Sequence, residues 1–256
     1  MALVAGVVGC ADRPQESAGS HSSRLYAAGN NGAAGGVVQC STPVSGGTAG
    51  DSPYAEGATA DTLEGAWRTA RSERLFDGAS TGYDIAASDD TRVLYVYAVD
   101  GAAKQAVVMR NGPATEGAGG PGWYVESWAR CDMSEFPDSV AAANFGQQIW
   151  TNAAGERMPT GRIVSAPGPE HCDWHDMTFL RLGDDAVYVR QPHRDLRNYF
   201  GEPFDPSLPL PEGAIDTGYR RAGDHLWLSP TEHRAYVGDR GGIEMWPRTI
   251  KPLGCA

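Results

Sequence analysis

The sequence predicts a β-dominated α+β fold with one N-terminal helix and two small antiparallel sheets, stapled by disulfides. Three observations predict it. Short apolar and β-branched runs alternate with turn residues, 33 glycines and 17 prolines occur among 256 residues, and the chain carries five cysteines. Glycine and proline favour turns, which suit many short strands better than long helices. Hydrophobic residues make up 41% and charged residues 21% of the chain, a balance typical of a globular protein.

The chain begins with a short apolar segment that ends at a cysteine. Residues 2–8 are apolar, Gly9 is small, and Cys10 follows directly. This order is typical of the end of a signal peptide, and a cysteine after the cleavage site indicates lipid attachment. No basic residue precedes Cys10, although a complete signal peptide begins with one. We therefore expect residues 1–10 to be a truncated lipoprotein signal segment; the alternative is an apolar N-terminus with a coincidental cysteine.

Residues 11–61 are predicted to be a flexible tether. They are rich in Gly, Ala, Ser, Thr and Asn, and residues 27–36 are of low complexity. The exception is the short apolar run of residues 37–40, which ends at Cys40 and is expected to attach the tether to the folded body through a disulfide.

Residues 62–165 are predicted to form a lobe with one helix and one antiparallel sheet. Residues 62–76 place apolar side chains at helical spacing, and Thr62 or Asp61 is suited to the N-cap. Asp100-Gly101 is a strong hairpin signal after an apolar run. Three strands of a meander are expected at residues 92–99, 105–110 and 122–131.

Residues 166–256 are predicted to form a second lobe of antiparallel strands, and the Pro/Gly-rich residues 166–169 mark its beginning. A hairpin is expected around Gly183-Asp184-Asp185, and residues 191–215 are expected to be a long surface loop. Regular turn signals between the remaining runs predict a small sheet or barrel-like sandwich. Those runs are residues 217–221, 225–228, 234–237 and 243–247.

If Cys10 takes a lipid, an even number of cysteines remains: Cys40, Cys131, Cys172 and Cys255. Disulfides persist in oxidising compartments outside the cytoplasm. Four cysteines allow three pairings, among which the sequence does not choose; we favour Cys40–Cys131 with Cys172–Cys255. None of the four has the CxxC spacing of a zinc ribbon or a thioredoxin-like motif.

Net charge and hydropathy exclude two classes of partner. The formal charge is −11 and the pI about 4.9, without the basic stripe of a nucleic-acid-binding protein. No apolar run approaches the roughly 18 residues of a transmembrane helix. We therefore expect no nucleic-acid partner, and contact with a membrane only through a lipid anchor.

Six runs of the chain carry a resemblance to known proteins: residues 122–135, 171–180, 216–220, 226–228, 246–248 and 254–255. Together they resemble a family of secreted or lipid-anchored actinobacterial proteins of unknown function. The resemblance covers roughly residues 62–256. It implies an extracytoplasmic location and a structural role for the cysteines, and it implies no activity.

The densest cluster of ligand-capable side chains lies around Cys172. In an extended segment His171, Asp173 and His175 would share one face, because alternate residues of a strand point the same way. Two imidazoles and a carboxylate suit zinc or another divalent metal. The alternative is a polar approach to a strand, with Cys172 held in a disulfide.

Tryptophans on or beside expected strands provide a second set of candidates. Exposed indole faces at Trp123, Trp128, Trp227 and Trp246 would stack on sugar rings or line a peptide-binding groove. The alternative is that these side chains fill a small core.

The leading hypothesis is a non-catalytic, surface-tethered extracytoplasmic lipoprotein that binds a cell-envelope ligand or protein and needs no cofactor. The sequence has neither a GxSxG nucleophile elbow nor a GxxxxGK[ST] phosphate loop. The alternative is a metal-dependent hydrolase that uses zinc at His171, Asp173 and His175. A chaperone or inhibitor domain that presents a sheet edge is a third hypothesis.

Overall fold

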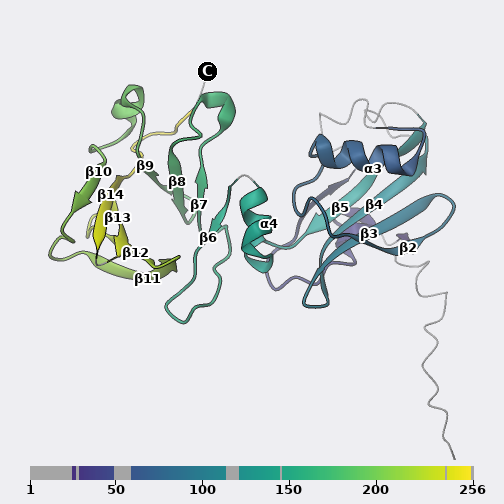
Figure 1. Cartoon of the computed structure of the whole chain (residues 1–256), viewed down its shortest axis with the longest axis horizontal. Coiled ribbons are helices and arrows are strands. Elements are labelled where there is room, and N and C mark those ends of the chain that lie inside the picture. Colours follow the sequence, from purple (N-terminus) through teal and green to yellow (C-terminus); the bar gives the residue numbers. More distant parts are fainter. Residues whose placement is uncertain are drawn as a thin grey trace, which may run out of the picture.

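The structure, a computed structural model, describes residues 25–26, 29–48, 59–113, 121–144, 146–239 and 241–254. Across these ranges the fold is β-dominated, with three antiparallel sheets and few helices. One sheet forms an N-terminal lobe and the other two form a C-terminal lobe, with α4 (Asp138–Ala143) between them (Figure 1). The predicted class is confirmed, but the expectation of two sheets and one helix is wrong, because the second lobe contains two sheets and short helices occur elsewhere. No described helix is both long enough and apolar enough to span a bilayer.

The N-terminal lobe is built on a five-stranded sheet in the order β1-β5-β4-β3-β2. Its strands are β1 (Ser45–Thr48), β2 (Asp84–Ser88), β3 (Arg92–Val99), β4 (Ala102–Gly112) and β5 (Gly122–Arg130). Asp100 and Gly101 connect β3 to β4 with φ angles of 51° and 78°. Two consecutive positive φ angles fit the right-handed twist of a hairpin, which explains the Asp-Gly signal.

Helix α3 (Leu63–Ser72) covers one face of this sheet (Figure 1). The side chain of Thr62 caps it by accepting a hydrogen bond from the N–H of Gly65 at 3.1 Å. Ala66 and Ala70 are buried in one cluster with residues of β4, and Trp67 lies on the ring of Tyr95 with centroids 4.0 Å apart. The sequence thus placed this helix and its cap correctly.

Residues 29–48 form a segment that we call the N-terminal strap. Its helix α2 (Gly32–Gly35) covers the opposite face of the sheet, where Ala34 is fully buried, and its strand β1 extends the sheet at the edge beside β5. A flexible tether over this range is therefore wrong. Small residues here permit close approach: a Cβ on Gly46 would lie 2.4 Å from the carbonyl oxygen of Trp128. Because both faces of the sheet are covered, the middle of strand β4 is a continuous apolar run.

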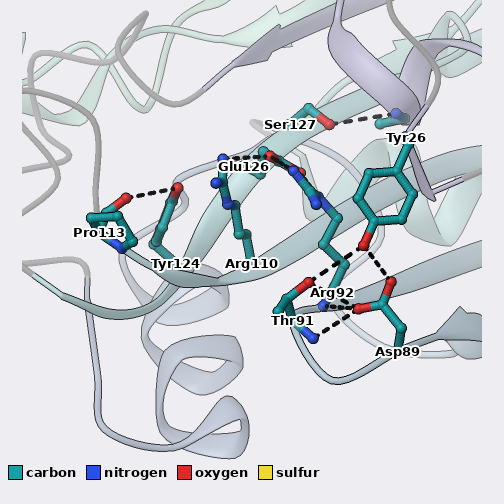
Figure 2. A network of polar contacts seen from close by, with 10 residues as sticks. Tyr26, Asp89, Thr91, Arg92, Arg110, Pro113, Tyr124, Glu126 and Ser127 are labelled. Carbon is teal, nitrogen blue, oxygen red and sulfur yellow. Dashed lines mark hydrogen bonds and ion pairs between the residues drawn. The ribbon is translucent and has the colours of Figure 1, made fainter.

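A polar network fastens the start of the described chain to the sheet (Figure 2). The hydroxyl of Tyr26 donates to Asp89 at 2.6 Å, and the guanidinium of Arg92 lies 4.3 Å from the centre of the Tyr26 ring. Arg92 donates twice to Glu126, each time at 2.7 Å, and Arg110 donates to the same carboxylate at 3.1 Å. Each carboxylate in the network has a charged or hydroxyl partner, so the network is a structural fastening.

A disulfide joins the strap to the end of β5. It links Cys40 and Cys131, with Cα atoms 5.1 Å apart, and confirms that pairing. Beside it, Glu135 accepts from the ammonium of Lys104 at 2.7 Å and from the backbone N–H of Thr42 at 2.9 Å. Cross-link and ion pair together fix the strap in place.

Hydrogen bonds across the connection hold the two lobes together. Arg157 donates to the carbonyl oxygens of Ser134 at 2.7 Å and Phe136 at 2.9 Å. The backbone N–H of Thr160 donates to Asp132 at 2.9 Å. Residues 151–160 are thereby tied to the segment that leaves the first lobe.

The C-terminal lobe contains a four-stranded sheet in the order β6-β7-β8-β9 and a five-stranded sheet in the order β10-β14-β13-β12-β11. The first comprises β6 (Gln148–Ile149), β7 (Ile163–Pro167), β8 (Thr178–Leu182) and β9 (Ala186–Arg190). The second comprises β10 (Asp205–Leu208), β11 (Ile215–Arg221), β12 (Asp224–Leu228), β13 (Arg234–Asp239) and β14 (Gly242–Pro247). The expected boundary between residues 165 and 166 falls inside β7, which pairs with β6. Pairing across the sheet therefore begins the lobe before the Pro/Gly-rich run.

These two sheets share one apolar core. Trp150, which directly follows β6, joins Leu180 and Tyr188 of the first sheet and Leu226 and Trp246 of the second in one buried cluster. The buried polar atoms have partners: the indole N–H of Trp150 donates to Ser165 at 2.9 Å, and the hydroxyl of Tyr188 donates to the carbonyl of Glu232 at 2.9 Å. The arrangement is a sandwich, with β9 next to β14.

Candidate functional site

A polar cavity of about 430 Å³ opens where the two sheets of the C-terminal lobe meet. We call it the charge-balanced cavity. One sheet contributes lining residues from β6, β8 and β9, and the other contributes them from each of its strands, β10 to β14. The polar lining residues are Gln148, Thr178, Arg190, Arg221, Asp224 and Glu244, and Trp246 adds an aromatic wall.

The strand period explains why a carboxylate faces this cavity. On β14, Ile243 and Met245 point to one side and join one cluster, whereas Trp246 belongs to the core between the sheets. Glu244 shares the side of Trp246 because alternate residues of a strand point the same way. The carboxylate is therefore directed inward, at the rim of the core.

Glu244 and Arg190 form a two-bond ion pair across the two sheets. Nε of Arg190 donates to Oε2 at 2.7 Å, and Nη2 donates to Oε1 at 2.8 Å. The indole N–H of Trp246 donates to Oε2 at 2.9 Å. Burial acts to raise the pKa of Glu244, but the hydrogen bonds from Arg190 and Trp246 outweigh it and lower the pKa. Glu244 is therefore a carboxylate at neutral pH, and its hydrogen bonds raise the pKa of Arg190.

The second cation, Arg221, is held from three sides. It donates to the side-chain oxygen of Gln148 in a short hydrogen bond and to Asp224 at 3.1 Å. Its guanidinium also lies 5.0 Å from the ring centre of Trp150. Gln148 of β6, Asp224 of β12 and Trp150, which directly follows β6, fix its position before any ligand arrives.

Two guanidinium groups and two carboxylates cancel in charge at this cavity, and hydrogen-bonding capacity remains. Nη1 of Arg190 and Oδ1 of Asp224 make no hydrogen bond to described residues, and neither does the hydroxyl of Thr178. Donors and acceptors thus stand side by side in a concave surface. Among the described lining residues there is no serine, cysteine or histidine, and Glu244 is held in its charged form. The arrangement is suited to recognition through hydrogen bonds.

The structure does not bring the four candidate tryptophans together. Trp123 and Trp128 lie on β5 and pack in the cluster beneath α3. Trp227 and Trp246 face opposite sides of their sheet, since Trp227 packs beside Tyr236 and Trp246 lies in the core, 1% exposed. A shared aromatic groove is therefore wrong, and of the four only Trp246 lines the charge-balanced cavity.

The alignment expected of His171, Asp173 and His175 is also wrong. Residues Glu170–Cys172 form a 3-10 turn, and Asp173 has a φ of 56°, so the segment is not extended. In the described parts of the chain, only Cys40, Cys131 and Glu135 bring three ligand-type atoms within 4.8 Å of one another. Two of those atoms are the sulfurs of a disulfide, which do not serve as thiolate ligands.

The structure tests the other cysteine predictions only in part. Cys172 is disulfide-bonded. Cys255, its favoured partner, lies outside the described residues, and so does Cys10, the expected lipidation site.

Sequence reasoning missed the charged residues of the cavity. None of Arg190, Arg221 and Glu244 was among the candidate residues. A signal was present at Glu244, a charged residue flanked by apolar residues at an inward position of a strand. That signal does not reveal the partner, because Arg190 lies 54 residues away.

Comparisons with protein-family models, with curated proteins and with solved structures found no match to this chain.

Proposed function

We propose that the protein is an extracytoplasmic, lipid-anchored, non-catalytic binding module. Its C-terminal lobe binds a neutral, hydroxyl-rich ligand of the cell envelope, such as a segment of glycan. The charge-balanced cavity is the observation that carries this proposal, since its volume falls within the range of about 300–1,000 Å³ common for small-molecule sites.

The charge balance supports a neutral ligand. A carboxylate that approached Arg190 would compete with Glu244, which already makes two charge-assisted hydrogen bonds to it. An ammonium group that approached Asp224 would compete with Arg221 in the same way. A hydroxyl group uses the free donor of Arg190 and the free acceptor of Asp224 without breaking either pair.

Cysteine usage supports the location. The Cys40–Cys131 disulfide and the bonded state of Cys172 fit an oxidising compartment, because cytosolic thiols are kept reduced.

Calorimetric titration of the full chain tests the binding proposal. The probes are chitotriose, which is neutral, the cationic glucosamine trimer and the anionic galacturonate trimer. We expect chitotriose to bind at least tenfold more tightly than either charged trimer. Equal binding of all three, or preference for a charged trimer, would overturn the proposed ligand class.

A matched pair of variants locates the site. Asp224→Ala removes a cavity acceptor, and we expect it to weaken chitotriose binding at least tenfold. Asp185→Ala removes an exposed carboxylate from the turn between β8 and β9, outside the cavity, and should leave binding unchanged. Equal affinity of the two variants would place binding elsewhere.

The anchor is tested separately, in cells that express the precursor. Metabolic labelling with an alkyne-tagged fatty acid should mark the wild-type protein, and Cys10→Ala should abolish the label. Label retained in Cys10→Ala would refute lipidation at this residue.

A further inference from the structure

A second cavity, of about 770 Å³, lies in the connection between β9 and β10. The sequence predicted a long surface loop here, but the connection contains the 3-10 segment Arg194–Tyr199 and leads directly into β10. No described residue lines both this cavity and the charge-balanced cavity. The two are therefore separate sites.

One part of the second cavity is apolar and well supported. Phe200 is 6% exposed and packs in a core cluster with Trp174, Met177 and Val189. Phe204 is half-buried and packs against the core between the sheets. Because both rings rest on buried residues, they provide a fixed apolar wall.

The rim of the same cavity is cationic. Arg194 and Arg197 are exposed, and neither forms an ion pair with a described residue. Nε of Arg197 donates to the carbonyl oxygen of Arg194 at 3.1 Å, which leaves its terminal nitrogens free. The carboxylate in the lining, Glu202, is engaged by Arg234.

His193 also lines this cavity, and its Nε2 lies 2.7 Å from a carboxylate oxygen of Asp176, which is not among the described lining residues. The two arginines therefore present positive charge beside an apolar wall.

Local cations matter because the chain carries a net charge of −11 and as a whole repels anions. We propose that this cavity binds a monomeric amphipathic anion. Its carboxylate or phosphate lies against Arg194 and Arg197, and its acyl or aromatic body lies on Phe200 and Phe204. Planar guanidinium donors match both head groups, and the rings bury the apolar body.

Calorimetric titration of the full chain with four small probes, each kept monomeric, tests this inference. Octanoate and octyl phosphate carry both recognition elements, octyl glucoside carries only the chain, and inorganic phosphate carries only the charge. We expect the two complete probes to bind at least tenfold more tightly than either partial probe, and their affinity to fall as salt is added.

Paired variants assign the contacts. Arg194→Gln combined with Arg197→Gln should weaken octyl phosphate at least tenfold, and Phe204→Ala should weaken it several-fold. Arg181→Gln, which changes an exposed arginine of β8 outside the cavity, should have no effect. Asp224→Ala should also have no effect, which separates this inference from the proposed function.

Three results would overturn the inference. Equal affinity for octyl glucoside and octyl phosphate would show that the site recognises only the apolar chain. Wild-type affinity in the double arginine variant would show that the two arginines do not hold the head group. Binding of anionic phospholipid vesicles alone would indicate a membrane surface in place of a monomeric ligand.

Discussion

The disulfide between Cys40 and Cys131 allows a quantitative test of how firmly the N-terminal strap is held. The bond joins residues separated by 91 positions, so it removes a large loop-closure entropy from the unfolded chain. For a loop of this length the chain-entropy model gives about 4.6 kcal/mol at 25 °C. Replacing both cysteines by alanine keeps each Cβ in place and removes only the sulfurs.

Two corrections bear on this value. Cys131 is fully buried, so losing its sulfur leaves a small void that adds to the loss. A compact unfolded state acts in the other direction, because it already limits the chain. We therefore expect the free energy of unfolding to fall by about 3–5 kcal/mol in Cys40→Ala/Cys131→Ala.

The assay is equilibrium unfolding in urea, followed by tryptophan fluorescence and by circular dichroism. Ser45→Ala, an exposed change on edge strand β1, is the control, and it should differ from the wild type by less than about 0.5 kcal/mol. A loss below about 1 kcal/mol in the double cysteine variant would refute the reasoning. It would mean that the strap is fixed without the cross-link.

Three further predictions concern single residues. Glu244→Leu removes the acceptor of Arg190 and Trp246. Because the ion pair is only partly buried, calorimetry should show that the free energy of unfolding falls by about 2–3 kcal/mol, less than for a fully buried pair. Glu244→Gln should lower it by about half as much. Burial acts to raise the pKa of Asp132, but hydrogen bonds led by that from Thr160 lower it. The Asp132 carboxylate therefore stabilises the fold above its unfolded pKa of about 4 and loses this effect as the pH falls through its lower folded pKa. Below pH 4 the free energy of unfolding should therefore fall less steeply with decreasing pH in Asp132→Asn than in the wild type. An unchanged slope would contradict this. Gly46→Ala should lower the free energy of unfolding in urea by about 2 kcal/mol, because the new Cβ would meet the backbone oxygen of Trp128. Gly242→Ala, where the new Cβ would meet open space, should lower it by less than half as much.

Local signals in the sequence were sufficient for the elements that depend on neighbouring residues. Thr62 caps α3 through a residue three positions away, and Asp100-Gly101 closes a hairpin between adjacent strands. In each case the stabilising contact lies within a few residues, so the pattern alone predicts it.

The N-terminal strap could not be predicted in this way. Gly46 and its neighbours have low intrinsic β-propensity, and β1 forms because it pairs with β5 about 80 positions away. Gly46, one of the glycines that suggested flexibility, is required for that pairing, since a side chain there would meet the backbone of Trp128. Low complexity here reflects close packing imposed by tertiary structure.

The candidate site depended even more on long-range structure. Periodicity places Glu244 on the inward side of a strand, but only the adjacency of β9 and β14 supplies Arg190. The expected alignment of His171, Asp173 and His175 was wrong for a local reason. Asp173 adopts a left-handed conformation at the end of a 3-10 turn, so the two-residue period of a strand does not apply there.

The fixed strap changes what the proposed lipid anchor implies. Leu25 is 2% exposed and packs in the cluster between strap and sheet. If Cys10 carries the lipid, residues 11–24 alone separate it from the folded body, and a chain of that length spans at most about 50 Å. The N-terminal lobe then lies next to the membrane, whereas both cavities belong to the C-terminal lobe on the other side of α4 (Figure 1). An anchor on the first lobe would therefore leave the two proposed binding sites of the second lobe free to meet ligands in the envelope.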